Sequence, residues 1–261
     1  MKPRTYRYKD EIADDFAGTN IKTKPTPPDW KYVHRNPVWL FFEFIVYRLI
    51  VQPFAYVASK VRYGTRIRNK KVLKAAKGKG IFIYGNHALV SGDAFHQSMA
   101  AYPRKGFVLT NPDATSLPML RNFVAMLGAM PLPEGVTGYR NFLAAMKHRI
   151  ATKKAVVIFP EAHIWPYYTK VRPFKSDSFL YPVTVAEGKA PVFAMTTVFK
   201  KRRVRTLPKC IVYLDGPFFA DTSLPVAEAR QKLRDEVYEK MCERVKESDY
   251  DRVTYIKEEA A

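Results

Sequence analysis

Two residues just after a short apolar run, His87 and Asp93, are the pair in this chain best suited to move a proton. The run, Ile81 to Tyr84, is bounded by glycines and predicts a buried strand. Ligands of open α/β sheets bind at the carboxyl ends of the strands, where a histidine in this position lies. A carboxylate bonded to one imidazole nitrogen fixes the tautomer and leaves the other nitrogen free to take a proton. The alternative is structural: a buried histidine with a satisfied partner, and an aspartate that caps the next helix.

The spacing decides whether this pair can form. Five residues intervene between His87 and Asp93. On a regular helix, an offset of six residues points two side chains in different directions. The pair therefore requires a loop, to which Gly92 is suited because glycine adopts backbone angles that other residues avoid. We expect the two side chains within hydrogen-bond distance, facing a cleft that they share with Glu161.

A second carboxylate, Glu161, follows the strongest predicted strand, 155–159. Because the carboxyl ends of parallel strands meet at one edge of a sheet, we expect Glu161 beside His87. His163 follows two residues later and is a candidate for the same pocket.

Strands and helices are predicted to alternate from residue 80 onward. This order favours an α/β fold with a mainly parallel central sheet flanked by helices, in one domain over 59–261. The predicted strands are 81–84, 106–110, 155–159, 191–199 and 210–214, and the predicted helices are 93–101, 116–127, 138–152 and 225–247.

The N-terminal part of the chain has two sections of different character. Residues 1–36 are polar, rich in lysine and proline, and predict an arm. Residues 37–58 are apolar nearly all round, but Glu43, Arg48 and Pro53 interrupt the run of about 20 apolar residues that a clean membrane span needs. We expect a bent, partly embedded or interfacial helical segment that associates with a membrane. The alternative is a buried core helix.

The charge of the chain favours an anionic partner. Its formal net charge is +20, which is typical of proteins that meet nucleic acid, an acidic membrane surface or a phosphorylated substrate. Basic residues are dense over 60–79, directly after the apolar segment, as in proteins that bind anionic lipid headgroups. No nucleic-acid motif accompanies the charge, so we expect an anionic membrane surface and no nucleic acid.

The two cysteines indicate a reducing compartment and no metal site. Cys210 and Cys242 have no metal-ligand spacing and need not pair. The first thirty residues lack the apolar core of a secretory signal. We therefore expect the protein at the cytoplasmic face of a membrane, held peripherally or as a monotopic protein.

The order of these blocks resembles a known family. His87 and Asp93, then Phe159-Pro160-Glu161 with a basic loop after it, then a strand that opens at Pro191, resemble the glycerolipid acyltransferases, whose best-known members acylate lysophosphatidic acid. The resemblance spans roughly 37–215. It implies transfer of a fatty acyl group from a thioester donor, acyl-coenzyme A or acyl carrier protein, to a hydroxyl of a lysophospholipid-like acceptor. It implies no metal, no cofactor beyond that thioester, and no acyl-enzyme.

The resemblance also implies a role for each residue. His87 is the general base, Asp93 orients it, and backbone N–H groups near Gly85 to Ala88 or at the following helix start are candidates to stabilise the oxyanion. Glu161 shapes the acceptor site, and the basic loop supplies charge for a phosphate. The residues expected to bind substrate are Asn86, Glu161, His163, Arg172 and Lys175.

Three departures separate this chain from the family pattern. The family usually has four residues between histidine and aspartate, where this chain has five. The stretch 128–134 lacks the usual arginine, and Ala162-His163-Ile164 replaces the usual Gly-Thr-Arg. Acyl transfer is therefore better supported than lysophosphatidic acid as the acceptor. The alternative function is a catalytically inactive member of the same fold that binds lipid or an acyl chain.

Overall fold

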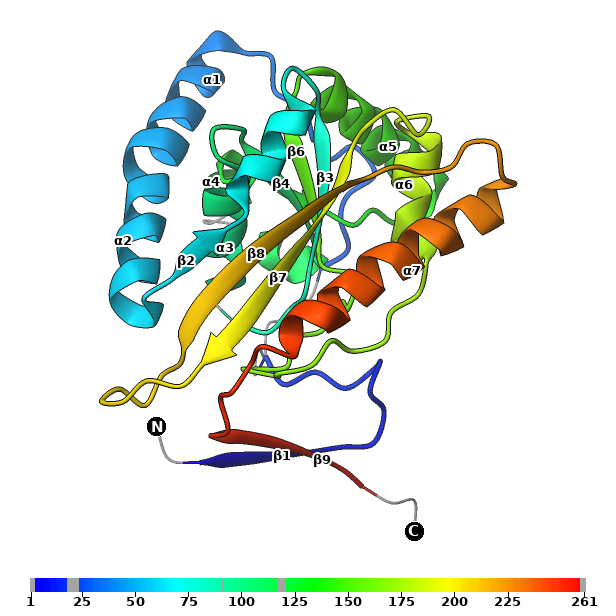
Figure 1. The fold of residues 1–261 in the computed structure, drawn as a ribbon. Coiled ribbons are helices and arrows are strands. Elements are labelled where there is room, and N and C mark those ends of the chain that lie inside the picture. Colours follow the sequence, from blue (N-terminus) through cyan, green and yellow to red (C-terminus); the bar gives the residue numbers. More distant parts are fainter. Residues whose placement is uncertain (1–2, 18–23, 91, 117–120, 259–261) are drawn as a thin grey trace.

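A mostly parallel sheet lies at the centre of the computed structural model, which describes residues 3–17, 24–90, 92–116 and 121–258 (Figure 1). In this part of the chain the sheet has seven strands in the order β2-β8-β7-β3-β6-β4-β5. Neighbouring strands are parallel except β7 and β8. The strands are β2 (Arg66–Arg68), β3 (Ile81–Gly85), β4 (Gly106–Thr110), β5 (Ala129–Pro131), β6 (Ala155–Ile158), β7 (Val192–Lys200) and β8 (Lys209–Phe218).

The predicted α/β architecture is confirmed. All five predicted strands are present, and β2 and β5 are additional three-residue strands at the two edges of the sheet. The predicted helix 116–127 is only partly described, because residues 117–120 lie outside the described residues. The helices that flank the sheet are α3 (Gly92–Ala101), α4 (Arg121–Met126), α5 (Gly135–Ala151), α6 (Leu180–Thr184) and α7 (Val226–Val245), with 3₁₀ turns η2 (Lys70–Ala76), η3 (Pro112–Thr115) and η4 (Asp177–Phe179).

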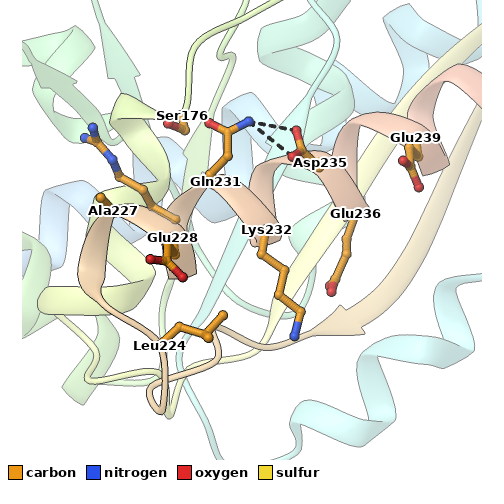
Figure 2. Close-up of a pocket in the computed structure, with 10 residues that line it drawn as sticks. Ser176, Leu224, Ala227, Glu228, Gln231, Lys232, Asp235, Glu236 and Glu239 are labelled. Carbon is orange, nitrogen blue, oxygen red and sulfur yellow. Dashed lines mark hydrogen bonds between the residues drawn. The ribbon is translucent and has the colours of Figure 1, made fainter.

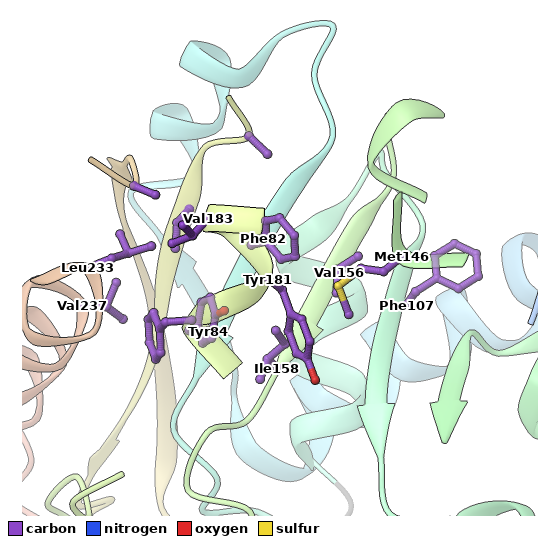
Figure 3. Close-up of a cluster of buried hydrophobic side chains, with 14 of the residues drawn as sticks. Phe82, Tyr84, Phe107, Met146, Val156, Ile158, Tyr181, Val183, Leu233 and Val237 are labelled. Atoms are coloured by element: carbon purple, nitrogen blue, oxygen red, sulfur yellow. The ribbon is translucent and has the colours of Figure 1, made fainter. Parts of the chain in front are cut away.

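Helices cover both faces of the sheet because its central strands are apolar on both faces. In β3, Phe82 and Tyr84 join the core under α5, α6 and α7, part of which Figure 3 shows. Ile81 and Ile83 point to the opposite face, into a core shared with α3 and η2. A strand buried on both faces has a continuous apolar run in its sequence, which is why the apolar runs located β3 and β6 well.

One long helix runs along the outside of the molecule (Figure 1). It comprises α1 (Pro37–Phe44), a π-helical stretch η1 (Ile45–Val51) and α2 (Gln52–Tyr63). Pro53 has no N–H to donate within an α-helix, and the π pattern lies directly before it. The helix has 27 residues, its most apolar 18-residue window has a mean hydropathy of 1.5, and it is long and apolar enough to cross a membrane, by length and composition.

The long helix faces outward with its apolar side chains. Phe41, Phe54 and Val61 are 61%, 61% and 63% exposed, and only 11% of the most apolar window is buried. Glu43 points the other way and pairs with Lys105 of the domain at 2.6 Å. The alternative of a buried core helix is therefore wrong, and the helix extends five residues beyond the predicted end at 58.

The first and last strands of the described chain lie side by side. β1 (Arg4–Tyr8) pairs in parallel with β9 (Val253–Lys257), below the main sheet in Figure 1. Further along the arm, Trp30 and Tyr32 are buried in the core beside α5. The described parts of the polar arm are thus packed against the α/β domain, and the predicted boundaries at 36 and 58 stay predictions.

Candidate functional site

The candidate dyad forms at the carboxyl end of β3. The strand ends at Gly85, a loop follows, and α3 begins at Gly92 with Asp93 in its first turn. His87 Nδ1 lies 2.8 Å from Asp93 Oδ2, which confirms the predicted hydrogen bond. The loop, and not a regular helix, therefore absorbs the longer spacing.

The Asp93 carboxylate holds the loop as well as the imidazole. Its Oδ2 atom also accepts the backbone N–H groups of Ala88 and Leu89, each at 2.9 Å. An oxygen that already accepts two N–H groups acts as an acceptor toward His87, so Nδ1 carries the proton. Nε2 then has its lone pair free. The side chain of His87 is 19% exposed, whereas that of Asp93 is 3% exposed.

Gly92 allows the tight approach of the loop to the helix. A Cβ atom at this position would lie 2.7 Å from Cδ1 of Leu89. Gly92 is the first residue of α3, and whether it supplies unusual backbone angles stays a prediction. Glycine is needed here for space, because Leu89 covers the start of α3.

An aromatic ring supports the imidazole. Phe159 stacks on His87 with ring centroids 4.5 Å apart and planes at 20°. A Cβ atom on Gly85 would lie 2.8 Å from Phe159 Cε1, so the end of β3 leaves room for this ring. The Phe-Pro-Glu block placed Phe159 near the site. Its stacking on His87 depends on packing between distant segments, which the sequence does not show.

Asn86 fastens the loop to β7. Its Nδ2 donates to the carbonyl oxygen of Thr197 at 3.1 Å, and its Oδ1 accepts the N–H of Thr197 at 2.7 Å. The residue is buried, with 1% of its surface exposed. This geometry gives Asn86 a positioning role and does not support the predicted substrate contact.

Glu161 lies directly against the backbone of His87. Its Oε2 accepts the N–H of His87 at 3.3 Å, and its Oε1 accepts the N–H of Arg172 at 3.3 Å. The Arg172 guanidinium completes a buried ion pair, with Nε 3.5 Å from Oε2. Burial raises the pKa of Glu161 to about 7, although Arg172 and the N–H of His87 oppose the shift.

Arg172 is an interior residue. Its guanidinium donates to the carbonyl oxygens of Glu11 at 3.1 Å and Glu161 at 2.9 Å, and also to that of His163. The side chain has no exposed surface. The predicted contact between Arg172 and a substrate phosphate is therefore not supported, and its role is to hold the loop that carries Glu161.

The backbone N–H groups after Gly85 are already in use. Those of His87, Ala88 and Leu89 bind the carboxylates of Glu161 and Asp93. The N–H groups of His87 and Ala88 therefore already have acceptors inside the protein, which does not support the expectation that they stabilise an oxyanion. Successive N–H groups form an anion-binding concavity, and internal carboxylates fill this one.

The remaining predicted residues lie further out. His163 is 34% exposed, with Nδ1 3.9 Å from Asp15 Oδ2, and its backbone N–H binds the carbonyl oxygen of Glu161. Lys175 is exposed and lines a separate hollow with Ile12 and Arg234. The structure thus brings His87, Asp93 and Glu161 together with Asn86 and Arg172 as supports, but not Lys175.

The loop after Glu161 and the terminal strand β9 support the site, and no sequence pattern predicted these contacts. The backbone N–H groups of Trp165 and Tyr167 bind the carbonyl oxygens of His87 and Ala88. Trp165 is fully buried and stacks on Tyr255 of β9, with centroids 4.7 Å apart. The two-stranded β1–β9 sheet therefore covers the loop that borders the dyad.

Two further observations concern a hollow away from the dyad and the residues that could bind a metal ion. A hollow of about 700 Å³ runs along α7 (Figure 2), where Gln231 binds Asp235, and its lining includes neither dyad residue. Among the described residues, no group of three or more His, Cys, Asp or Glu side chains could hold a metal ion.

The fold is similar to that of a solved acyltransferase. That protein is the 1-acyl-sn-glycerophosphate (LPA) acyltransferase PlsC from Thermotoga maritima; the TM-score is 0.58, over 81% of this chain and 88% of that one. The two sequences are 16% identical over this match. No family model and no curated protein sequence matches the chain. The similarity shows an acyltransferase-like fold.

Proposed function

We propose that the protein is a membrane-associated acyltransferase. It moves a fatty acyl group from a thioester, acyl-coenzyme A or acyl carrier protein, to a hydroxyl of a lysophospholipid-like acceptor. The observation that carries the proposal is the hydrogen bond between His87 Nδ1 and Asp93 Oδ2 at the carboxyl edge of the sheet. The fold similarity to an acyltransferase adds to it.

The proposed reaction uses the free imidazole nitrogen. His87 Nε2 takes the proton of the acceptor hydroxyl as its oxygen attacks the thioester carbonyl. The tetrahedral intermediate collapses, the C–S bond breaks, and the thiolate leaves with the proton that the imidazolium held. Asp93 stabilises the imidazolium and keeps its orientation, as in other histidine–carboxylate pairs.

The long helix supports attachment to a membrane. Apolar side chains cover its outer face, and Glu43 on its inner face is paired with Lys105. Because one side of the helix packs on the domain, we propose that it lies in the membrane interface, with the domain on the cytoplasmic side. A lipid acceptor would then reach the site from the membrane.

Thiol release tests the proposal. The membrane-bound protein is given long-chain acyl-coenzyme A, or the acyl thioester of acyl carrier protein, as donor, with lysophosphatidic acid, an uncharged lysolipid or glycerol 3-phosphate as acceptor. Release that requires an acceptor and His87 supports acyl transfer and names the acceptor class. Binding of acyl donor with no release for any pair would favour the inactive lipid-binding alternative.

A further inference from the structure

Two adjoining hollows lie on the side of the molecule where α2 meets the end of α3. The first, of about 590 Å³, is lined by Pro53, Tyr56 and Val57 of α2 and by Met99 of α3. The second, of about 790 Å³, is lined mostly by η2 and the turn after it. Lys70 and Tyr102 line both hollows and join them.

The second hollow is strongly cationic. Five lysines between Lys70 and Lys79 line it, together with Arg104 and Lys153. Among the described residues that line the two hollows there is no aspartate or glutamate. Seven positively charged side chains with no acidic side chain among them attract an anionic group such as a phosphate.

Lys70 is the half-buried charge at the centre. Its Nζ donates to the carbonyl oxygen of Met99 at 2.9 Å and lies 5.1 Å from the ring centroid of Tyr102. The ammonium group has three donors, and no carboxylate of the described residues forms an ion pair with it within 4.0 Å. Burial lowers the pKa of Lys70. A bound phosphate would supply the missing negative charge and further acceptors.

The arginines of this region are bound to backbone carbonyl oxygens, whereas most of its lysines are exposed to solvent. Arg48 binds the carbonyl oxygen of Pro103, and Arg104 binds those of Lys79 and Ala76. Lys71 and Lys74 are exposed and are available to an anion from solvent or from a membrane surface.

The hollows are separate from the dyad. Lys79 precedes β3 and Arg104 precedes β4, so the cationic hollow lies at the amino edge of the sheet. His87 lies at the opposite, carboxyl edge. The hollows adjoin the outward face of the long helix, because Tyr56 and Val57 line the first hollow and are themselves exposed.

We propose that the two hollows bind one anionic phospholipid of the membrane. Its phosphate contacts Lys70 and the neighbouring lysines of η2, and its acylated glycerol lies against Tyr56 and Val57. The apolar hollow beside a lipid-facing helix favours a membrane lipid over a soluble phosphate. The site does not depend on the proposed catalysis.

Vesicle binding tests the site. Affinity is measured for phosphatidylcholine vesicles with and without phosphatidic acid. The test variant is Lys70→Gln with Lys74→Gln, and the control, Lys147→Gln with Arg203→Gln, removes the same charge from exposed positions elsewhere. We expect the phosphatidic-acid-dependent affinity to fall about 30-fold in the test variant, at about 1 kcal/mol for each of the two lysines near lipid, and about twofold in the control. Equal losses in both would mean diffuse attraction and overturn the proposal.

Stoichiometry provides a second readout. Native mass spectrometry in detergent should find one phosphatidic acid on each chain of the parent and of His87→Ala, and none on Lys70→Gln. Thermal unfolding of Lys70→Gln checks that it is folded, and Lys70→Arg should retain the lipid. Stoichiometric displacement of the lipid by free coenzyme A would assign the site to a thioester donor and overturn the phospholipid proposal.

Discussion

The Oε2 atom of Glu161 binds the backbone N–H of His87 at 3.3 Å and lies 3.5 Å from Arg172 Nε. One carboxylate oxygen therefore links the loop of the candidate base to a buried cation eleven residues further along the chain. The ion pair fixes the position of the His87 backbone, while Asp93 fixes its ring. Two carboxylates thus hold one histidine, Glu161 at its backbone and Asp93 at its ring.

Replacing Arg172 by methionine should destabilise the fold, because Glu161 would be left buried without its ion partner. We expect a loss of about 3–5 kcal/mol in the free energy of unfolding, measured by urea denaturation. Lys175→Met is the matched control on the same loop. Because Lys175 is exposed, its loss should cost less than about 0.5 kcal/mol. A stable Arg172→Met protein that bound acceptor poorly would return Arg172 to a substrate-binding role.

The raised pKa of Glu161 predicts a pH-dependent stability. Because its pKa is about 7 in the folded protein, against 4.5 for an ordinary glutamate, the folded state holds the proton more tightly. This contribution is fully present below pH 4.5 and is lost as the pH rises through about 7, at up to about 1.4 kcal/mol per pH unit.

Glu161→Gln should remove this slope, since glutamine does not titrate. Denaturation at several pH values between 4.5 and 7 would reveal it as a parent curve that falls relative to the variant curve. Parallel curves over that range would show that Glu161 is ionised throughout.

Asp93→Asn should reduce turnover more than stability. The amide oxygen can still accept the N–H groups of Ala88 and Leu89, but an amide cannot stabilise the imidazolium as a carboxylate does. We expect kcat to fall by about 10²–10⁴-fold with little change in KM. Asp251→Asn, at an exposed ion pair, should leave kcat unchanged. Normal turnover by Asp93→Asn would show that the aspartate is only a helix cap.

The outward face of the long helix should control membrane binding. Leu49 and Ile50 are 62% and 58% exposed, so Leu49→Ser with Ile50→Ser should leave the fold intact. Burial of two such side chains in lipid is worth about 2 kcal/mol or more, so we expect at least about 30-fold weaker vesicle binding in a flotation assay.

Val136→Ser with Val204→Ser is the control for this prediction. These valines are even more exposed, at 88% and 92%, but lie outside the long helix of residues 37–63. Their replacement should leave vesicle binding unchanged, and an equal loss from both pairs would contradict the proposed orientation.

The sequence predicted the sheet and the dyad because both depend on local patterns. Continuous apolar runs mark β3 and β6, and the residue that follows each run lies at the same edge of the sheet. Gly92 correctly indicated a loop between His87 and Asp93, although the reason is space beside Leu89.

The sequence could not predict contacts between distant segments. Arg172 in a basic loop has the pattern of a phosphate ligand, but carbonyl oxygens from the arm and from its own loop surround it. In the same way, nothing local shows that β1 pairs with β9, or that Asn86 binds the backbone of Thr197. Such bonds form only when the whole chain is folded.

Thiol release from long-chain acyl-coenzyme A by membrane-bound parent protein and His87→Ala, over the same set of acceptors, tests the central claim most directly. We expect acceptor-dependent release by the parent and at least a 100-fold lower rate for a folded His87→Ala protein, since general-base catalysis contributes about 10²–10⁴-fold. Equal rates for the two proteins would contradict the assignment of His87 as the base.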